Sequence, residues 1–369
     1  MRHILLTFSC FMTSRDFLSN LVARFLSFAS KPAFSEISLI VPERVCVILK
    51  QWLTISPGTF QRDCKLTQIV LQLLEHPSLP VTEARKVRQI VESSILYKRR
   101  SIQFPKMEIG KLPRPILPTL FTPQYFEFID LDPLEVSKQL TLLDHSLYCR
   151  LEKKELLKCR WSKPNKQLHS PNVTLLSHRF NNLSRWVISM IVGMADLQPR
   201  VLMLMRFIVI AYYCLRLRNF NTTAAILSAL NASPVRRLQK TWQGVHEFYV
   251  DLFDRMQGLL EPAKNFKIYR NVLNGSSTVP CMPYLGRFLT DLTFISEMKD
   301  GSNGMVNVQK CLKLAKVISQ IFKYREVKFL FTPVPSIQAY FCSLEVPSEE
   351  ELFKASLKVE PKEFDFDYF

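Results

Sequence analysis

The sequence predicts an all-α protein made of a smaller N-terminal helical block and a larger helical block. Three observations carry this prediction: glycine is scarce at 9 residues in 369, proline is common at 22, and apolar residues recur at helical spacing. Few glycines and long runs with a period near 3.6 residues are typical of helices joined by proline-containing connections. Alternating strand patterns and hairpin-turn dipeptides are rare.

The N-terminal block spans residues 1–110 and carries apolar stripes at helical spacing. Val45, Leu49 and Trp52 lie at positions i, i+4 and i+7, so they share one face of a helix. We expect this face to pack on the larger block and to stabilise it. The proline-rich segment 111–123 (KLPRPILPTLFTP) then predicts a linker, because proline lacks an amide donor and disfavours helix before it.

The larger block spans residues 124–369 and begins with a strong helix start. Asp132 is suited to the N-cap, Pro133 to the first helical position, and Glu135 to a capping box. A strongly apolar helix is expected near residues 197–217, at the centre of the core.

The chain shows the signs of a protein of the cytoplasm. Its nine cysteines form no CxxC pair and no metal-ligand spacing, which favours reduced thiols and no metal site. The apolar N-terminal run has no convincing cleavage site, and we expect it to be a buried helix end. The apolar run near 201–215 is short and is interrupted by Arg206, so we expect no transmembrane segment.

Residues 283–324 predict an αα-hairpin with two different faces. The apolar face of its first helix carries Leu285, Phe288, Leu289, Leu292 and Ile295. The opposite face carries Thr290, Thr293 and Glu297, with Phe294 beside them. A polar loop and a second apolar run follow, as an αα-hairpin requires. We expect the hairpin to protrude from the domain body, because its polar face has no partner in the sequence.

Enzyme signatures are mostly absent. The chain contains no GxxxxGK[ST], GxGxxG, GxSxG or HExxH motif, and its six histidines are scattered. We therefore expect a protein that acts by binding, with no cofactor and no bound metal.

The net charge is +17, from 49 Lys and Arg against 32 Asp and Glu. Nucleic acid, an anionic membrane surface and an acidic protein patch are all suitable partners for such a charge. The basic residues are spread along the chain without a recognisable nucleic-acid module. Charge alone leaves these alternatives open.

Several segments, in order along the chain, resemble the signature blocks of Ras-type guanine-nucleotide exchange factors. The segments are residues 130–144, 180–187, 218–242, 280–297, 337–340 and 351–361. The likeness extends from Thr122 to the end of the chain. Residues 3–18 and 44–52 are similar to the Ras exchanger motif of that family, and the resemblance implies that this motif is truncated at its start. The resemblance implies an all-helical catalytic domain from residue 124, preceded by this smaller domain.

The resemblance also implies a mechanism in which the hairpin opens a small GTPase of the Ras family. Thr293 matches the wedge position, and Glu297 matches the carboxylate that competes for the donors of the phosphate site. Thr293 is shorter than an aliphatic wedge, so part of the displacement is expected from Phe294 and Glu297. Tyr284 matches an aromatic residue at the hairpin base that packs against the GTPase.

The other expected GTPase contacts are Lys138, Thr141, Asn219 and Asn221, which match positions that hold the second switch. Each also has a plain structural explanation: a solvated lysine, a threonine bonded to its own helix, or an asparagine that caps a turn.

Three functions remain in competition. The first is guanine-nucleotide exchange on a Ras-family small GTPase, bound with GDP or without nucleotide, which makes the chain a regulator and not an enzyme. The second is a catalytically silent scaffold of the same fold, which the short Thr293 and a short hairpin loop keep open. The third is a basic helical nucleic-acid-binding protein, which the absence of motifs disfavours. For the first we expect a cytoplasmic protein with peripheral contact to anionic membranes and no nucleic acid.

Overall fold

The computed structural model describes residues 1–29, 36–97, 112–124, 126–261, 263–274, 279–300 and 306–361. Within these ranges the chain forms helices and no β-strand, so the predicted all-α class is confirmed. The chain divides into two compact units. The first is Met1–Ile109 with Phe294–Ile318, and the second is Gly110–Thr293 with Ser319–Phe369.

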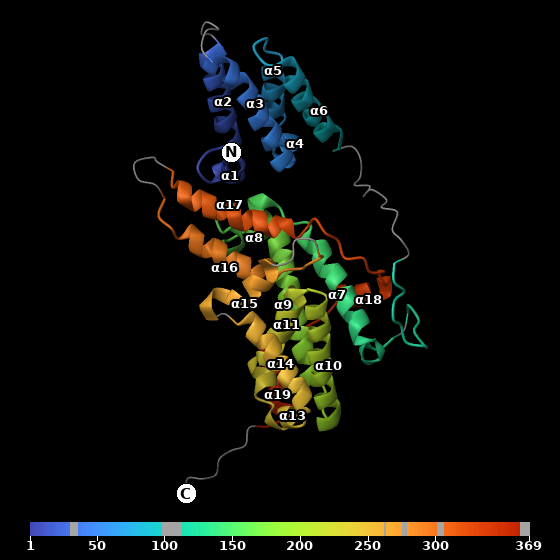
Figure 1. The fold of residues 1–369 in the computed structure, drawn as a ribbon. Helices are drawn as coiled ribbons and strands as arrows, with labels where there is room; N and C mark the ends of the chain where they lie inside the picture. Colours follow the sequence, from blue (N-terminus) through green and yellow to red (C-terminus); the bar gives the residue numbers. More distant parts are fainter. Residues whose placement is uncertain are drawn as a thin grey trace. The chain divides into compact units, whose positions relative to one another are not determined.

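The N-terminal part of the first unit contains six α-helices in its described residues. They are α1 (Arg2–Thr7), α2 (Ser14–Ala29), α3 (Glu36–Ile55), α4 (Pro57–Arg62), α5 (Cys64–Leu73) and α6 (Val81–Tyr97). Helix α3 lies between α2 and α6 (Figure 1). Asp63 starts α5 by accepting a hydrogen bond from the Leu66 amide. The Arg15 guanidinium, 2.9 Å away, also lowers the pKa of the Asp63 carboxyl.

An aromatic cluster around Trp52 forms the core of these helices. The Trp52 side chain is fully buried, and its ring makes edge contacts with Phe8, Phe17 and Phe60 at centroid distances of 5.3, 5.0 and 4.8 Å. We expected the stripe that includes Trp52 to pack on the larger block. That expectation was wrong, because the helices of its own unit cover this face.

The second unit holds most of the remaining helices. They are α7 (Pro133–Tyr148), α8 (Lys166–His169), α9 (Pro171–Val192), α10 (Leu197–Arg216), α11 (Phe220–Asn231), α12 (Ser233–Arg236), α13 (Gln239–Gln243), α14 (Glu247–Leu260), α15 (Ala263–Asn274), α18 (Pro335–Cys342) and α19 (Glu349–Val359). Short 3-10 turns η2 (Phe128–Asp130), η3 (Lys153–Leu156) and η4 (Arg160–Ser162) join them. The hairpin helices α16 (Leu285–Ser296) and α17 (Val308–Lys323) each have residues in both units.

Helix α10 is the centre of the second unit's core, as the sequence predicted. Leu204, Phe207 and Ile208 are buried, and α10 packs against α7, α9 and α11 (Figure 1). By length and composition alone, α10 is the one described helix that is apolar enough to cross a membrane. Its packing is that of a core helix, and it also buries Arg200, which donates a hydrogen bond to Thr241 Oγ1 over 2.8 Å.

Helix α7 begins where the sequence predicted, but without the expected capping box. The Asp132 carboxylate accepts hydrogen bonds from the amides of Leu134 and Glu135. The Glu135 carboxylate instead accepts from Gln139 Nε2 at 2.7 Å and from the Ile116 amide at 3.0 Å. It thereby fixes the non-helical segment 112–124 against α7. The domain boundaries and the protrusion of the hairpin stay predictions.

Candidate functional site

The first hairpin helix, α16, is anchored by one face. Of the predicted apolar stripe, Leu285, Phe288 and Leu292 are buried, and Leu289 and Ile295 are half-buried. Asp291 adds an ion pair, because its carboxylate lies 2.9 Å from Arg270 and 2.8 Å from Arg287. Burial raises the pKa of Asp291, and Arg270 opposes this shift. These contacts hold α16 from one side.

The other side of α16 carries the residues matched to the wedge. Both threonine hydroxyls bond to their own helix: Thr290 Oγ1 donates to the Gly286 carbonyl at 3.0 Å and Thr293 Oγ1 to the Leu289 carbonyl at 2.9 Å. Such bonds fix each hydroxyl on its own helix. The Phe294 side chain is 65% exposed, the largest exposed apolar group on this helix. Phe294 is therefore the main apolar group on this side of α16.

Glu297 lies in the turn that follows α16 and is exposed. The sequence placed Glu297 on the same helical face as Thr293, but the helix ends at Ser296, one residue earlier. The Met298 amide donates to the Ile295 carbonyl at 3.2 Å and so shapes this turn. The direction of the Glu297 carboxylate thus depends on the turn, and not on the helix alone.

Lys310 of α17 closes this turn. Its ammonium donates to the carbonyls of Ser296 and Met298 at 2.8 and 2.7 Å, and to Asp300 Oδ1 at 2.9 Å. A cation at a helix C-terminus satisfies otherwise unpaired carbonyls and complements the helix dipole. Sequence reasoning missed Lys310, because its role depends on which residues face each other across the hairpin.

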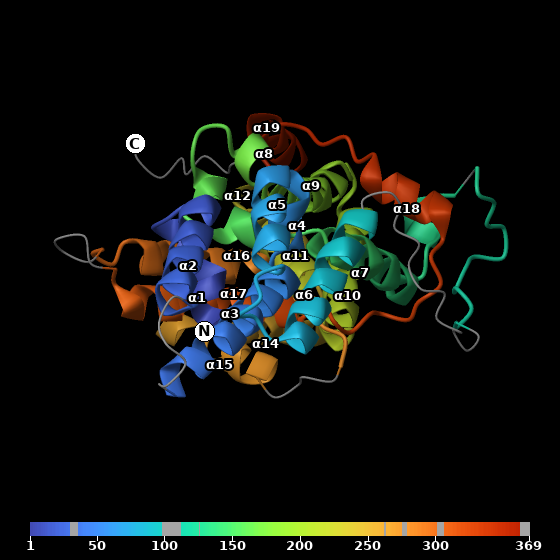
Figure 2. The same ribbon diagram turned by 90° about the horizontal axis from the view of Figure 1, so that it is seen from above.

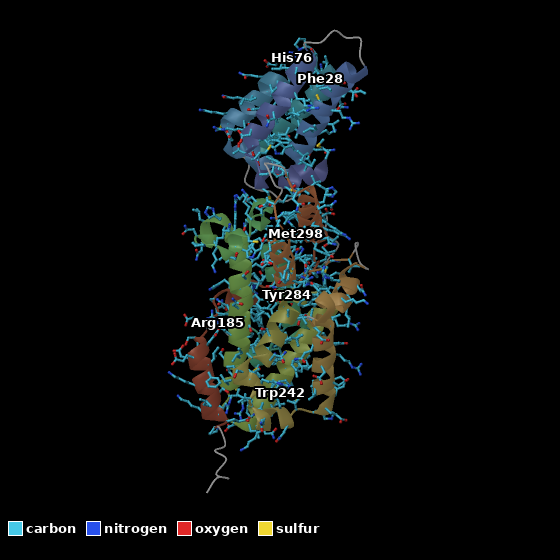
Figure 3. The ribbon with its side chains drawn as sticks, turned by 90° about the vertical axis from the view of Figure 1, so that its left-hand side faces the viewer. Phe28, His76, Arg185, Trp242, Tyr284 and Met298 are labelled. Atoms are coloured by element: carbon cyan, nitrogen blue, oxygen red, sulfur yellow. The ribbon has the colours of Figure 1, made fainter. Side chains whose placement is uncertain are left out.

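Tyr284 stands at the start of α16, and Met298 lies just beyond its end (Figure 3). The Tyr284 ring stacks on Phe180 with centroids 5.5 Å apart, and the Tyr284 amide donates to Tyr269 Oη at 2.8 Å. Burial raises the pKa of the Tyr284 hydroxyl above its ordinary value. Gly286 makes room for this ring, since a Cβ there would lie 2.7 Å from the Tyr284 hydroxyl.

A groove of about 440 Å³ opens beside the stacked rings of Phe180 and Tyr284. Its walls come from α9, α11, α14 and α15 and carry Leu227, Leu260 and Phe266 among other residues. A smaller cavity of about 190 Å³ also borders the two rings and includes Asn221. The paired rings thus border two open cavities at the hairpin base.

The chain segment before α16 is fixed to the start of α11. The Phe220 amide donates to the Met282 carbonyl at 2.9 Å, and the Met282 amide donates to the Arg218 carbonyl at 3.0 Å. Asn219 lies inside this bridge and caps α11 by accepting from the Thr222 amide at 3.0 Å. The position of Tyr284 therefore depends on the start of α11.

A buried polar network around Asp144 holds that start. Asp144 Oδ2 accepts from Thr222 Oγ1 at 2.7 Å and from Asn221 Nδ2 at 3.1 Å, while Oδ1 accepts from Arg179 Nε at 2.7 Å. Asn219 Nδ2 donates to Thr141 Oγ1 at 3.0 Å. One carboxylate thus connects α7, α9 and α11, and a buried network of this kind fixes a single arrangement.

The structure places four of the predicted contact residues on α7 and at the start of α11, mostly inside the protein. Thr141 and Asn219 have no exposed surface, and Asn221 is only 3% exposed. The Lys138 ammonium pairs with the Glu135 carboxylate at 3.2 Å. In this structure Thr141 and Asn219 offer no side-chain surface to a partner. Their hydrogen bonds support the hairpin base instead. Direct contact with a GTPase stays a prediction for all four.

Comparison with known proteins agrees with these motifs. Residues 135–312 match the model of the RasGEF domain. The chain is 33% identical over 330 residues to Ras guanine nucleotide exchange factor Y of Dictyostelium discoideum, covering 86% of this chain and 22% of that protein. It is 31% identical to exchange factor J of the same organism, covering 97% of this chain and 45% of that protein.

A further similar protein is Cell division control protein 25 of Saccharomyces cerevisiae. It is 33% identical over 263 residues, which cover 69% of this chain and 17% of that protein. The chain therefore spans less than half the length of each of these three relatives.

Proposed function

This chain belongs to the Ras-type guanine-nucleotide exchange factors, and we propose that it opens the nucleotide site of a Ras-family small GTPase. GDP then leaves, and GTP binds to the empty site by mass action. One observation carries the proposal: α16 is anchored through Leu285, Phe288 and Leu292, while Phe294 on the same helix stays 65% exposed. A helix that is anchored on one side and exposes a phenylalanine on the other is suited to insertion.

Two actions of the inserted segment are combined in this proposal. Phe294 and the methyl group of Thr293 displace a switch segment of the GTPase by occupying its space. Glu297 then offers a carboxylate to the donors that phosphate has left, because an unsatisfied buried donor costs free energy. Lys310 holds the turn in which Glu297 lies.

The groove beside Phe180 and Tyr284 is proposed to receive an apolar side chain of the GTPase. Its mixture of aromatic and aliphatic walls supports this role, since apolar anchors in pockets supply much of the binding energy at interfaces. The Asp144 network behind it would keep the groove in its binding shape.

No covalent bond is made or broken in this cycle, so we propose a regulator without catalytic chemistry or a cofactor of its own. The magnesium ion belongs to the GTPase and leaves with the nucleotide. We place the chain in the cytoplasm, near an anionic membrane surface. The net charge of +17 supports that location.

A catalytically silent scaffold is the second candidate. One observation favours it: the Thr293 hydroxyl is bonded to its own helix, which leaves only a methyl group as the wedge. Such a protein would bind the GTPase without speeding nucleotide release.

Complex formation with nucleotide-free GTPases separates these candidates. Members of the Ras family, stripped of nucleotide by chelation of magnesium, are passed with the chain over a sizing column. An exchange factor forms a complex that dissociates when GDP or GTP is added in excess. The exchange factor also accelerates release of a fluorescent GDP analogue. A scaffold forms a complex that nucleotide leaves intact and shows no acceleration. Absence of any complex across the panel would contradict both candidates.

A further inference from the structure

Residues 157–169, here called the basic loop, form an exposed connection between η3 and α9. Four cations lie in the basic loop: Lys158, Arg160, Lys163 and Lys166. No aspartate or glutamate occurs in the sequence from Leu156 to Ala195. Among the described residues, no ion pair joins these four cations to a carboxylate. Their charge is therefore uncompensated by near neighbours.

The carboxylates just before the loop are already occupied. Glu152 pairs with Lys154 at 2.7 Å. Glu155 is fully buried and accepts hydrogen bonds from the amides of Asn172 and Val173 at 2.8 and 3.0 Å, at the start of α9. The loop thus adds positive charge to the surface without local neutralisation.

The basic loop has a defined shape. Leu157 is buried at its start, and the backbone adopts left-handed φ angles at Lys158, Cys159 and Asn165, of 58°, 50° and 61°. Helix α8 packs beside α9, which fixes the far end of the loop (Figure 2). Because little ordering remains to be done on binding, such a loop presents its cations at low entropic cost.

An exposed leucine lies among these charges. Leu168 is 77% exposed, and Leu175 in the first turns of α9 is 44% exposed. Aliphatic side chains within a cationic surface are typical of segments that settle at the interface of anionic bilayers. A single-stranded nucleic acid would instead need accessible rings for base stacking, whereas Trp161 of this loop is half-buried.

We propose that the basic loop binds the surface of an anionic bilayer. Its lysines and its arginine contact the lipid headgroups, and Leu168 enters the boundary between headgroups and acyl chains. The proposal needs no GTPase, so it stands apart from the exchange function. Where both hold, attachment also brings α16 to the bilayer, because Cys159 Sγ of the loop lies 4.0 Å from the Leu292 carbonyl oxygen.

Sedimentation of the full chain with vesicles tests the proposal. The vesicles are phosphatidylcholine alone, or phosphatidylcholine with about one quarter phosphatidylserine. We expect binding to the anionic vesicles only, and weaker binding as salt rises. Each lysine near such a surface strengthens binding by about fivefold, so Lys163→Gln with Lys166→Gln should weaken it by about 30-fold. The matched control is Lys267→Gln with Lys358→Gln, two exposed lysines elsewhere in the second unit, which should change it little.

Leu168→Gln separates a bilayer from other anionic partners. We expect it to weaken vesicle binding about fivefold while leaving the salt dependence unchanged, because it removes apolar contact and no charge. Circular dichroism of each variant checks that it is folded. Equal losses in the loop variant and the control would overturn the proposal. So would binding that is insensitive to Leu168, or binding to a single-stranded oligonucleotide with no binding to vesicles. Exchange assays without vesicles keep this outcome separate from the proposed function.

Discussion

Replacing Lys310 with methionine tests whether the turn after α16 must be held for exchange. Methionine keeps most of the side chain's length and removes the ammonium. The Lys310 side chain is 13% exposed, and its ammonium donates to two carbonyl oxygens at the end of α16. Its third acceptor, Asp300, is 87% exposed and adds little.

The expected loss of free energy that holds the turn follows from these contacts. A hydrogen bond to a charged donor contributes about 1.5–3 kcal/mol when buried, and partial exposure reduces this. We take about 2 kcal/mol for the two carbonyl bonds together, which shifts the turn toward open forms by about 30-fold. Because Glu297 then loses its fixed position, Lys310→Met should slow stimulated nucleotide release by about tenfold or more.

Stopped-flow release of a fluorescent GDP analogue measures this effect, and amide exchange at residues 296–300 reports the turn directly. Lys313→Met is the matched control, since Lys313 lies on the same helix and is exposed. If the Lys310 and Lys313 variants release nucleotide equally fast while amide exchange shows an opened turn, Glu297 does not need a fixed turn.

Further changes test the support of the site. Asp144→Asn should lower the free energy of unfolding by about 3 kcal/mol in urea titrations, because it leaves the Arg179 guanidinium without its charge partner in the interior. A loss below about 0.5 kcal/mol, as at an ordinary surface site, would contradict a stabilising role of the network. Trp52→Ala should cost about 3–5 kcal/mol of stability through the cavity it leaves, seen as a lower melting temperature of the first unit. Gly286→Ala should displace the Tyr284 ring and weaken GTPase binding, while circular dichroism stays helical; unchanged affinity would remove that ring from the docking groove.

Local features of the fold were predictable from the sequence. The start of α7 at Asp132 and Pro133 depends only on neighbouring residues, and it was confirmed. The predicted capping box at Glu135 was not confirmed. The Ile116 amide, 19 residues away in sequence, donates to the Glu135 carboxylate instead. A pattern within one helix does not show which distant donor approaches.

The packing of the N-terminal stripe shows the same limit. The periodicity at Val45, Leu49 and Trp52 correctly marks a buried helix face. It carries no information on which helices cover that face. Rings from Phe8, Phe17 and Phe60 close around Trp52, and these residues come from three separate segments.

The resemblance named the candidate site residues, and their roles stay predictions; it did not predict what surrounds them. The resemblance matched Thr141 and Asn219 to contact positions, but both are buried. Asn219 bonds to Thr222, which in turn bonds to Asp144, 78 positions away in sequence, and no motif predicts such a network. Lys310 belongs to no family motif. Only the pairing of α16 with α17 brings it to the turn after α16.

The central claim is that the Glu297 carboxylate takes the place of the departing phosphate, and one kinetic comparison tests this claim most directly. Stimulated release of fluorescent GDP is measured for the wild type, for Glu297→Ala, and for Glu345→Ala as an exposed control. Both variants should keep a free energy of unfolding within about 0.5 kcal/mol of wild type, as exposed substitutions usually do. We predict that only Glu297→Ala slows release, because the vacated phosphate donors lose their substitute acceptor. Release by Glu297→Ala at the wild-type rate, on a GTPase that the wild type activates, would contradict the carboxylate mechanism and leave displacement by Thr293 and Phe294 as the cause.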